Sequence, residues 1–87
     1  MIYYAVFLPL LDLEKSQKYR PQHLDYLEQK RDEGKIFVNG PFVDGTGGLV
    51  IYQVSSLEEV KEIVQNDPYV LKGARGFEIH EWAMVGL

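Results

Sequence analysis

The 87-residue chain contains no cysteine. Without a thiol it can form no disulfide framework, thiolate zinc site or iron–sulfur cluster, and it has no cysteine nucleophile. Its only two histidines, His23 and His80, lie far apart in the sequence, so they lack the short spacing of a histidine metal motif. We therefore expect no metal and no cofactor, although zinc held with help from Asp67 stays open as an alternative.

Positive charge and long apolar runs are also scarce. Nine Lys and Arg stand against thirteen Asp and Glu, for a net charge of −4, which argues against a nucleic-acid partner or an acidic membrane surface. The apolar run over residues 1–9 is too short to span a bilayer and lacks the basic start and cleavage site of a signal peptide. We therefore expect a cytoplasmic protein with no membrane partner.

The composition suits one small globular domain over residues 1–87, because 46% of the chain is apolar and 13% is aromatic. A chain of this length buries only roughly 60–65% of the surface that it exposes when unfolded. Such a domain often gains stability from a partner subunit.

Hydrophobic patterning and turn residues predict four strands and two helices. The first strand, over residues 2–8, is rich in β-branched and aromatic residues on both faces, whereas residues 10–19 are expected to form a loop. Pro21 suits the first turn of a helix over residues 21–33. Ser and Glu at capping-box spacing begin a second helix over residues 55–65. The remaining strands are predicted over residues 36–43, 49–54 and 76–85, with a glycine-rich turn at 44–48.

The resulting order, β-α-β-β-α-β, predicts an α+β fold: a ferredoxin-like sandwich with both helices on one face of a four-stranded antiparallel sheet. The other sheet face would stay uncovered, although the first and third strands are apolar on that side too. Because an apolar face of this size is a liability on a monomer, we expect a two-fold homodimer packed through the sheet face.

Four short motifs resemble one known family. The sequence RPQHL at 20–24 resembles the R-P-x-H-L signature of YciI-like proteins, and EGK at 33–35, GP at 40–41 and DPY at 67–69 follow in the order and spacing of that family. The resemblance covers nearly the whole chain. It implies a single YciI-like domain that forms a dimeric α/β barrel, similar in architecture to muconolactone isomerases.

The resemblance also implies a site. YciI-like proteins are thought to use a histidine and an aspartate as an acid–base pair, and these fall on His23 and Asp67. The family includes a dehydrochlorinase that acts on a chlorinated hydroxyhydroquinone, so we expect a cofactor-independent lyase or isomerase acting on a small cyclic or aromatic compound. The chain departs from many relatives in its short turn at 44–48, where they carry a longer insertion, and its ligand is therefore expected to differ in size or type.

The two candidate catalytic residues also have structural interpretations. Imidazole titrates near neutral pH, so His23 suits a general acid or base, but a half-buried histidine bonded to backbone gives the same pattern. An aspartate before proline often binds local backbone where a helix ends. Asp67 could do that, or it could orient and stabilise the imidazole of His23.

Four further residues are expected near a substrate. Gly40 and Pro41 interrupt a strand and are placed near the pocket mouth, and Pro41 could follow a cis peptide bond. Arg20 could hold an anionic substrate or pair with a surface carboxylate, and Tyr69 could line the pocket or pack beneath a loop. We leave His80 out of the site.

Two other functions stay open at this point. The same fold could serve a non-catalytic ligand-binding or regulatory dimer, since a fold does not determine a function. The apolar sheet face could also recruit a different protein.

Overall fold

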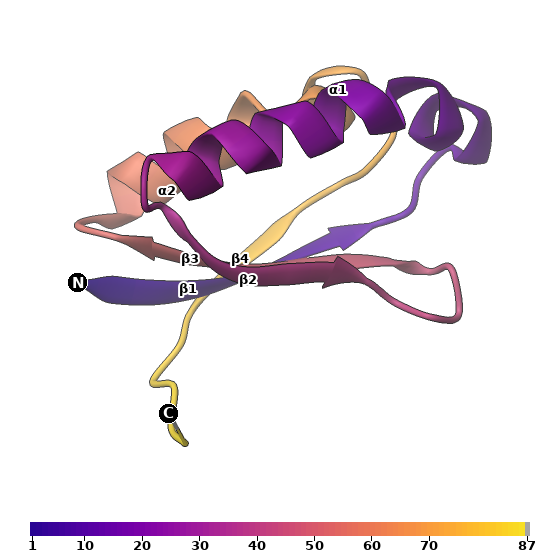
Figure 1. Ribbon diagram of the computed structural model, residues 1–87. Coiled ribbons are helices and arrows are strands. Elements are labelled where there is room, and N and C mark those ends of the chain that lie inside the picture. The colour runs from indigo at the N-terminus through magenta and orange to yellow at the C-terminus, as the bar shows by residue number, and fades with distance from the viewer. Residues whose placement is uncertain (87) are drawn as a thin grey trace.

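The computed structural model of the protein describes residues 1–86. Its elements, in chain order, are β1 (Ile2–Pro9), α1 (Leu13–Asp32), β2 (Ile36–Pro41), β3 (Gly47–Val54), α2 (Leu57–Gln65), α3 (Pro68–Leu71) and β4 (Glu78–Glu81). The strands form one antiparallel sheet in the order β2-β3-β1-β4, and the helices all lie on one side of it (Figure 1). This confirms the predicted ferredoxin-like α+β fold.

The core lies between the helices and the sheet. Alternate residues of β1 and β3 face the helices in register, with Tyr4 opposite Tyr52 and Val6 opposite Val50. Val60 of α2 is fully buried against them. The apolar side chains on this face of the sheet and those on the helices thus bury one another. This packing also brings α1 close to the part of the chain around α3.

The first helix begins earlier than predicted. It starts at Leu13, and residues 13–19, expected as a loop, form its first two turns. Asp12 is the N-cap, since its carboxylate accepts a hydrogen bond from the backbone N–H of Lys15 at 3.0 Å. Pro21 therefore lies inside the helix, and its missing N–H leaves the Gln17 carbonyl without a partner in the helix. Both residues are exposed, so water can bind that carbonyl.

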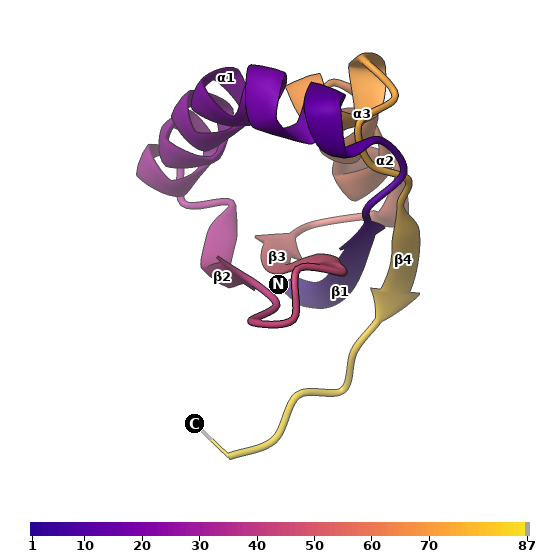
Figure 2. The same cartoon turned by 90° about the vertical axis from the view of Figure 1, so that its right-hand side faces the viewer.

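The other element ends also differ from the predictions. β4 spans Glu78–Glu81 rather than residues 76–85, because it pairs only with β1 at the sheet edge and the chain leaves the sheet after Trp82 (Figure 2). β2 ends at Pro41 instead of residue 43, where the turn to β3 begins. α2 begins at Leu57, after the N-cap Ser56. The short helix α3 was not predicted.

The second face of the sheet carries no helix (Figure 2). Tyr3, Phe7, Leu49 and Ile51 alternate with the core residues of β1 and β3 and so lie on this outer face. The Tyr3 and Phe37 rings meet edge to face there, 5.8 Å apart. None of the helices described is long and apolar enough to cross a membrane.

Candidate functional site

A buried histidine–aspartate pair joins α1 to the start of α3. His23 Nδ1 lies 2.7 Å from Asp67 Oδ1, and the two residues are 7% and 0% exposed. Because an ionised carboxylate only accepts hydrogen bonds, this contact requires the proton to be on Nδ1. Nε2 is then the nitrogen left to exchange a proton with a ligand.

Asp67 contacts both local backbone and His23. It is the N-cap of α3, where Oδ1 also accepts from the backbone N–H of Tyr69 at 2.9 Å. The short helix thereby holds the carboxylate toward α1. Oδ2 is buried and has no hydrogen-bond partner within residues 1–86. The carboxylate is therefore oriented by two donors at one oxygen and unsatisfied at the other.

The negative charge of Asp67 affects the pKa of two tyrosines, the partly buried Tyr26 and the buried Tyr52. Burial, followed by the negative charge of Asp67, raises the pKa of Tyr26 to about 12. The same two causes, in the same order, raise the pKa of Tyr52. Both phenols therefore stay protonated and neutral at physiological pH, and they add no second negative charge beside Asp67.

Three side chains from different segments are stacked at the site. The rings of His23 and Tyr69 are nearly parallel, with centroids 3.9 Å apart and an angle of 16° between their planes. On the tyrosine ring rests the guanidinium of Arg75, whose central carbon is 4.6 Å from the centroid. The imidazole is thus restrained on one side by Asp67 and over its face by Tyr69.

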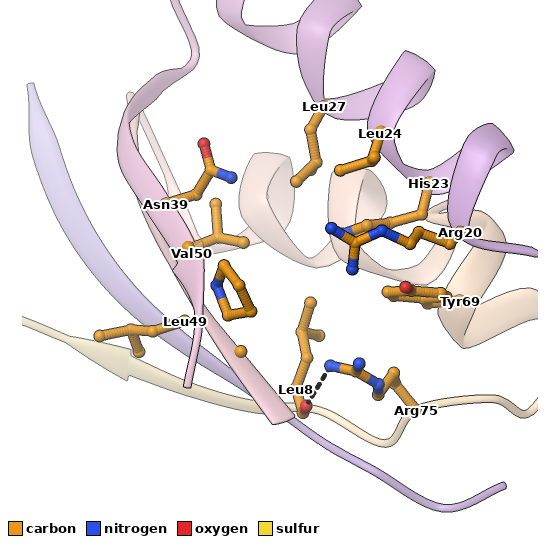
Figure 3. Close-up of a pocket in the computed structure, with 13 residues that line it drawn as sticks. Leu8, Arg20, His23, Leu24, Leu27, Asn39, Leu49, Val50, Tyr69 and Arg75 are labelled. Atoms are coloured by element: carbon orange, nitrogen blue, oxygen red, sulfur yellow. Dashed lines mark hydrogen bonds between the residues drawn. The ribbon is translucent and has the colours of Figure 1, made fainter. Parts of the chain in front are cut away.

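A pocket opens beside this stack (Figure 3). Its cavity volume is about 50 Å³, and it is open to solvent. Leucine and valine side chains from β1, α1 and β3 contribute an apolar lining, and the polar groups include His23, Arg20, Arg75 and Asn39. No acidic side chain is among its lining residues. The pocket thus combines an apolar lining with the imidazole of His23 and the two arginines at its wall.

The structure brings the predicted site residues together. Five of them line this pocket: Arg20, His23, Gly40, Pro41 and Tyr69. Asp67 does not line the pocket itself but is hydrogen-bonded to His23, which does. All described peptide bonds are trans, that of Pro41 included. His80 is exposed and lies outside the pocket lining, on the outer sheet face opposite Ala5. Arg20 has no carboxylate partner within residues 1–86, so its predicted surface ion pair does not form there.

Several lining residues were not predicted from the sequence. Arg75 is the most informative of them, because it is charged and only part-buried. It lies between Ala74 and Gly76, and nothing in its sequence spacing connects it with His23. Within residues 1–86 no group of three His, Cys, Asp or Glu side chains is arranged to hold a metal ion.

Comparisons with known proteins agree with this architecture. The model of the YCII-related domain matches residues 3–83. The uncharacterised protein YjpA of Bacillus subtilis is 33% identical over 82 residues, which cover 93% of this chain and 96% of YjpA. The protein YciI of Escherichia coli O6:H1 is 38% identical over 71 residues, or 70% of this chain and 72% of YciI.

A solved structure is similar over almost the whole chain. It is 5-chloro-2-hydroxyhydroquinone dehydrochlorinase (TftG) from Burkholderia phenoliruptrix, in complex with 2,5-dihydroxybenzoquinone. The TM-score is 0.81 and the sequence identity 26%, with 92% of each chain covered.

Proposed function

Because this chain belongs to the family of YCII-related domains, we propose that it is a small enzyme that uses His23 and Asp67 as an acid–base pair on a cyclic or aromatic compound. The observation that carries the proposal is the buried 2.7 Å contact between His23 Nδ1 and Asp67 Oδ1 at the wall of a pocket. The reaction is a lyase or isomerase step that needs no cofactor.

In this mechanism Nε2 of His23 removes a proton from a carbon or hydroxyl next to a carbonyl. The imidazole becomes an imidazolium, which the carboxylate of Asp67 stabilises through Nδ1. In an elimination, the electrons of the broken C–H bond form a C=C bond and a leaving group departs with its bonding pair. In an enol–keto shift, His23 returns the same proton to another atom of the substrate.

Two observations support a ring substrate. Leu8, Leu27 and Val50 give the pocket an apolar lining against which a flat ring can pack. The structurally similar dehydrochlorinase acts on a substituted hydroquinone and was solved with a hydroxylated quinone. A chlorinated or enolisable ring compound is therefore the first substrate class to test.

The proposed enzyme is a cytoplasmic homodimer that packs through the outer sheet face. Tyr3, Phe7 and Phe37 place aromatic surface on that face without a covering helix. A second copy related by two-fold symmetry would cover it. Sedimentation should give about twice the mass of the 10.0 kDa chain, whereas a monomer would contradict the proposed assembly.

The test of catalysis compares His23→Ala and Asp67→Asn with the wild type on a panel of enolisable and chlorinated ring compounds, with products identified by mass spectrometry. A positioned acid–base group contributes about 10²–10⁴ in rate, so we expect His23→Ala to lose that much. Lys61→Gln changes an exposed residue of α2 that lies outside the pocket and away from the outer sheet face, and it should keep full activity.

Unchanged turnover in both pocket variants would refute the proposed pair. If a compound binds but is never converted, and both variants weaken its binding, the protein is instead a non-catalytic ligand-binding dimer.

A further inference from the structure

The acid–base mechanism leaves one part of the pocket unused, its two arginines. Arg20 of α1 and Arg75 of the turn after α3 both line the pocket (Figure 3). Both also line the adjoining hollow that continues toward residues 42–47, so they stand where the two spaces meet. A ligand whose ring lies beside His23 can therefore extend a substituent between them.

Arg75 is held in a defined orientation. Its Nε and Nη2 donate to the hydroxyl of Ser16 at 3.3 and 3.0 Å, and Nη1 donates to the Leu8 carbonyl at 3.3 Å. The guanidinium also stacks on Tyr69. A guanidinium has five N–H groups, so these contacts leave one N–H on each terminal nitrogen without a hydrogen-bond partner within residues 1–86. The guanidinium of Arg75 is therefore oriented before any ligand binds.

The positive charge of the two arginines is not neutralised locally. Neither forms an ion pair within residues 1–86, and no acidic side chain lines either hollow. The chain as a whole carries a net charge of −4, so this concentration of positive charge runs against its overall composition. Two guanidinium groups beside a space without acidic side chains are suited to bind a planar oxyanion, because a guanidinium can donate two parallel hydrogen bonds to it.

We propose that Arg20 and Arg75 form an anion subsite, which binds a carboxylate or an ionised enol on the ring substrate. This inference rests on the proposed function, because it assigns the orientation of a substrate that His23 would act upon. A carboxylate and the ionised enol of a hydroxyquinone, which is a vinylogous acid, are both planar and share negative charge between two oxygens. With that group held at the arginines, the ring lies in the apolar part of the pocket and a ring carbon faces the imidazole.

The test measures the binding of charged and neutral probes of matched shape to the full chain, by calorimetry and by NMR of the arginine Nε–H groups. For a carboxylate, the charged probe is benzoate and the neutral probe is benzamide. For an ionised enol, the charged probe is 2,5-dihydroxybenzoquinone, a strong vinylogous acid, and the neutral probe is its 2,5-dimethoxy analogue. We expect the wild type to bind at least one anion about tenfold or more tightly than its neutral partner. Whichever of the two probe pairs shows this preference identifies the oxyanion as a carboxylate or an ionised enol.

Matched variants separate the subsite from a general charge effect. Arg20→Gln and Arg75→Gln should each reduce the anion preference about tenfold, whereas Lys61→Gln, which removes an exposed charge outside both hollows, should leave it unchanged. Arg75 also ties Leu8 to Ser16, so its variant could lose stability. Arg20 has no side-chain hydrogen bond within residues 1–86, so Arg20→Gln breaks no such bond and tests the subsite without a loss of stability.

The results distinguish this proposal from the proposed enzyme. Equal binding of charged and neutral probes, no binding of either anion at millimolar concentration, or an anion preference that survives both arginine substitutions would overturn the subsite even if His23-dependent turnover is found. Conversely, an arginine-dependent anion preference that persists in His23→Ala supports the subsite even if no catalysis is detected.

Discussion

Two of the ion pairs within residues 1–86 have similarly short distances between nitrogen and oxygen, but they differ in burial. His23 and Asp67 are 2.7 Å apart in the core, whereas Lys35 Nζ and Glu59 Oε2 are 2.5 Å apart near the surface. Their side chains are 9% and 1% exposed in the first pair, and 35% and 26% in the second.

The two carboxylates also differ in how completely they are satisfied. Glu59 accepts from Lys35 through Oε2 and from the backbone N–H and hydroxyl of Ser55 through Oε1, so both oxygens are occupied at the start of α2. Asp67 has a buried oxygen with no partner within residues 1–86, and its histidine lines a pocket. A hydrogen-bonded carboxylate alone is thus no sign of a functional site. Burial, incomplete satisfaction and an adjoining cavity together distinguish Asp67.

The largest predicted effect on stability comes from removing the buried carboxylate. Asp67→Ala leaves the N–H groups of His23 Nδ1 and Tyr69 without their acceptor and removes the N-cap of α3. Breaking one side of a buried pair costs about 3–5 kcal/mol, and we expect urea unfolding at pH 7 to show a loss of about 3 kcal/mol.

Glu59→Ala is the matched control at the surface, and it should cost about 1 kcal/mol or less. Equal losses in the two variants would remove the energetic distinction between the pairs. Asp67→Asn, which keeps the shape and one acceptor oxygen, should lose less stability than Asp67→Ala. The asparagine variant is therefore the better one for tests of activity.

A smaller effect is predicted for Tyr26, which lies between the two pairs. Its hydroxyl donates to the Ile63 carbonyl at 2.7 Å, one of the last four carbonyls of α2 and hence without a partner inside the helix. Tyr26→Phe keeps the ring but removes this bond, and urea unfolding should show a loss of about 1 kcal/mol. A variant as stable as the wild type would show that water replaces the hydroxyl, as it can at the surface but not in the core.

The element order of the fold could be predicted because its signals are local. Alternation of apolar residues defines the strands, and the Ser–Glu spacing before α2 marks a cap that Ser56 forms by accepting from Glu59. The start of α1 was missed although Asp12 is a good N-cap residue, since Pro21 gave a stronger signal for a first turn. Proline is tolerated there because that side of the helix faces solvent.

The site could be predicted only through family resemblance. No periodicity connects His23 with Asp67, which meet because α1 packs against α3 on the same side of the sheet. Arg75 had no such resemblance to identify it. Its position over Tyr69 depends on a turn in which the backbone N–H groups of Ala74 and Arg75 both donate to the Tyr69 carbonyl. Contacts of this kind arise from tertiary packing and leave no mark in residue spacing.

The smallest predicted effect is a pH dependence of stability that arises from the surface pair of Lys35 and Glu59. Hydrogen bonds from Lys35 first, and then from Ser55, lower the pKa of Glu59 from its usual 4.5 to about 2. Because the pKa is lower in the folded state, the pair stabilises the protein above pH 4.5, and this contribution is lost as the pH falls toward 2. Lys35→Met should move the pKa of Glu59 back upward, although only part of the way because the Ser55 bonds remain.

An NMR titration of the Glu59 carboxyl carbon measures this shift directly, and urea unfolding at pH 6 and pH 3 measures its consequence. The stability difference between wild type and Lys35→Met should be a fraction of a kcal/mol at pH 6 and smaller at pH 3. Lys30→Met is the matched control, since Lys30 pairs with Glu33 at 3.4 Å and has no contact with Glu59. If Glu59 titrates identically in the wild type and in Lys35→Met, the ion pair is not formed in solution. The surface contact would then be weaker than its 2.5 Å distance indicates, and the contrast with the buried pair would be greater still.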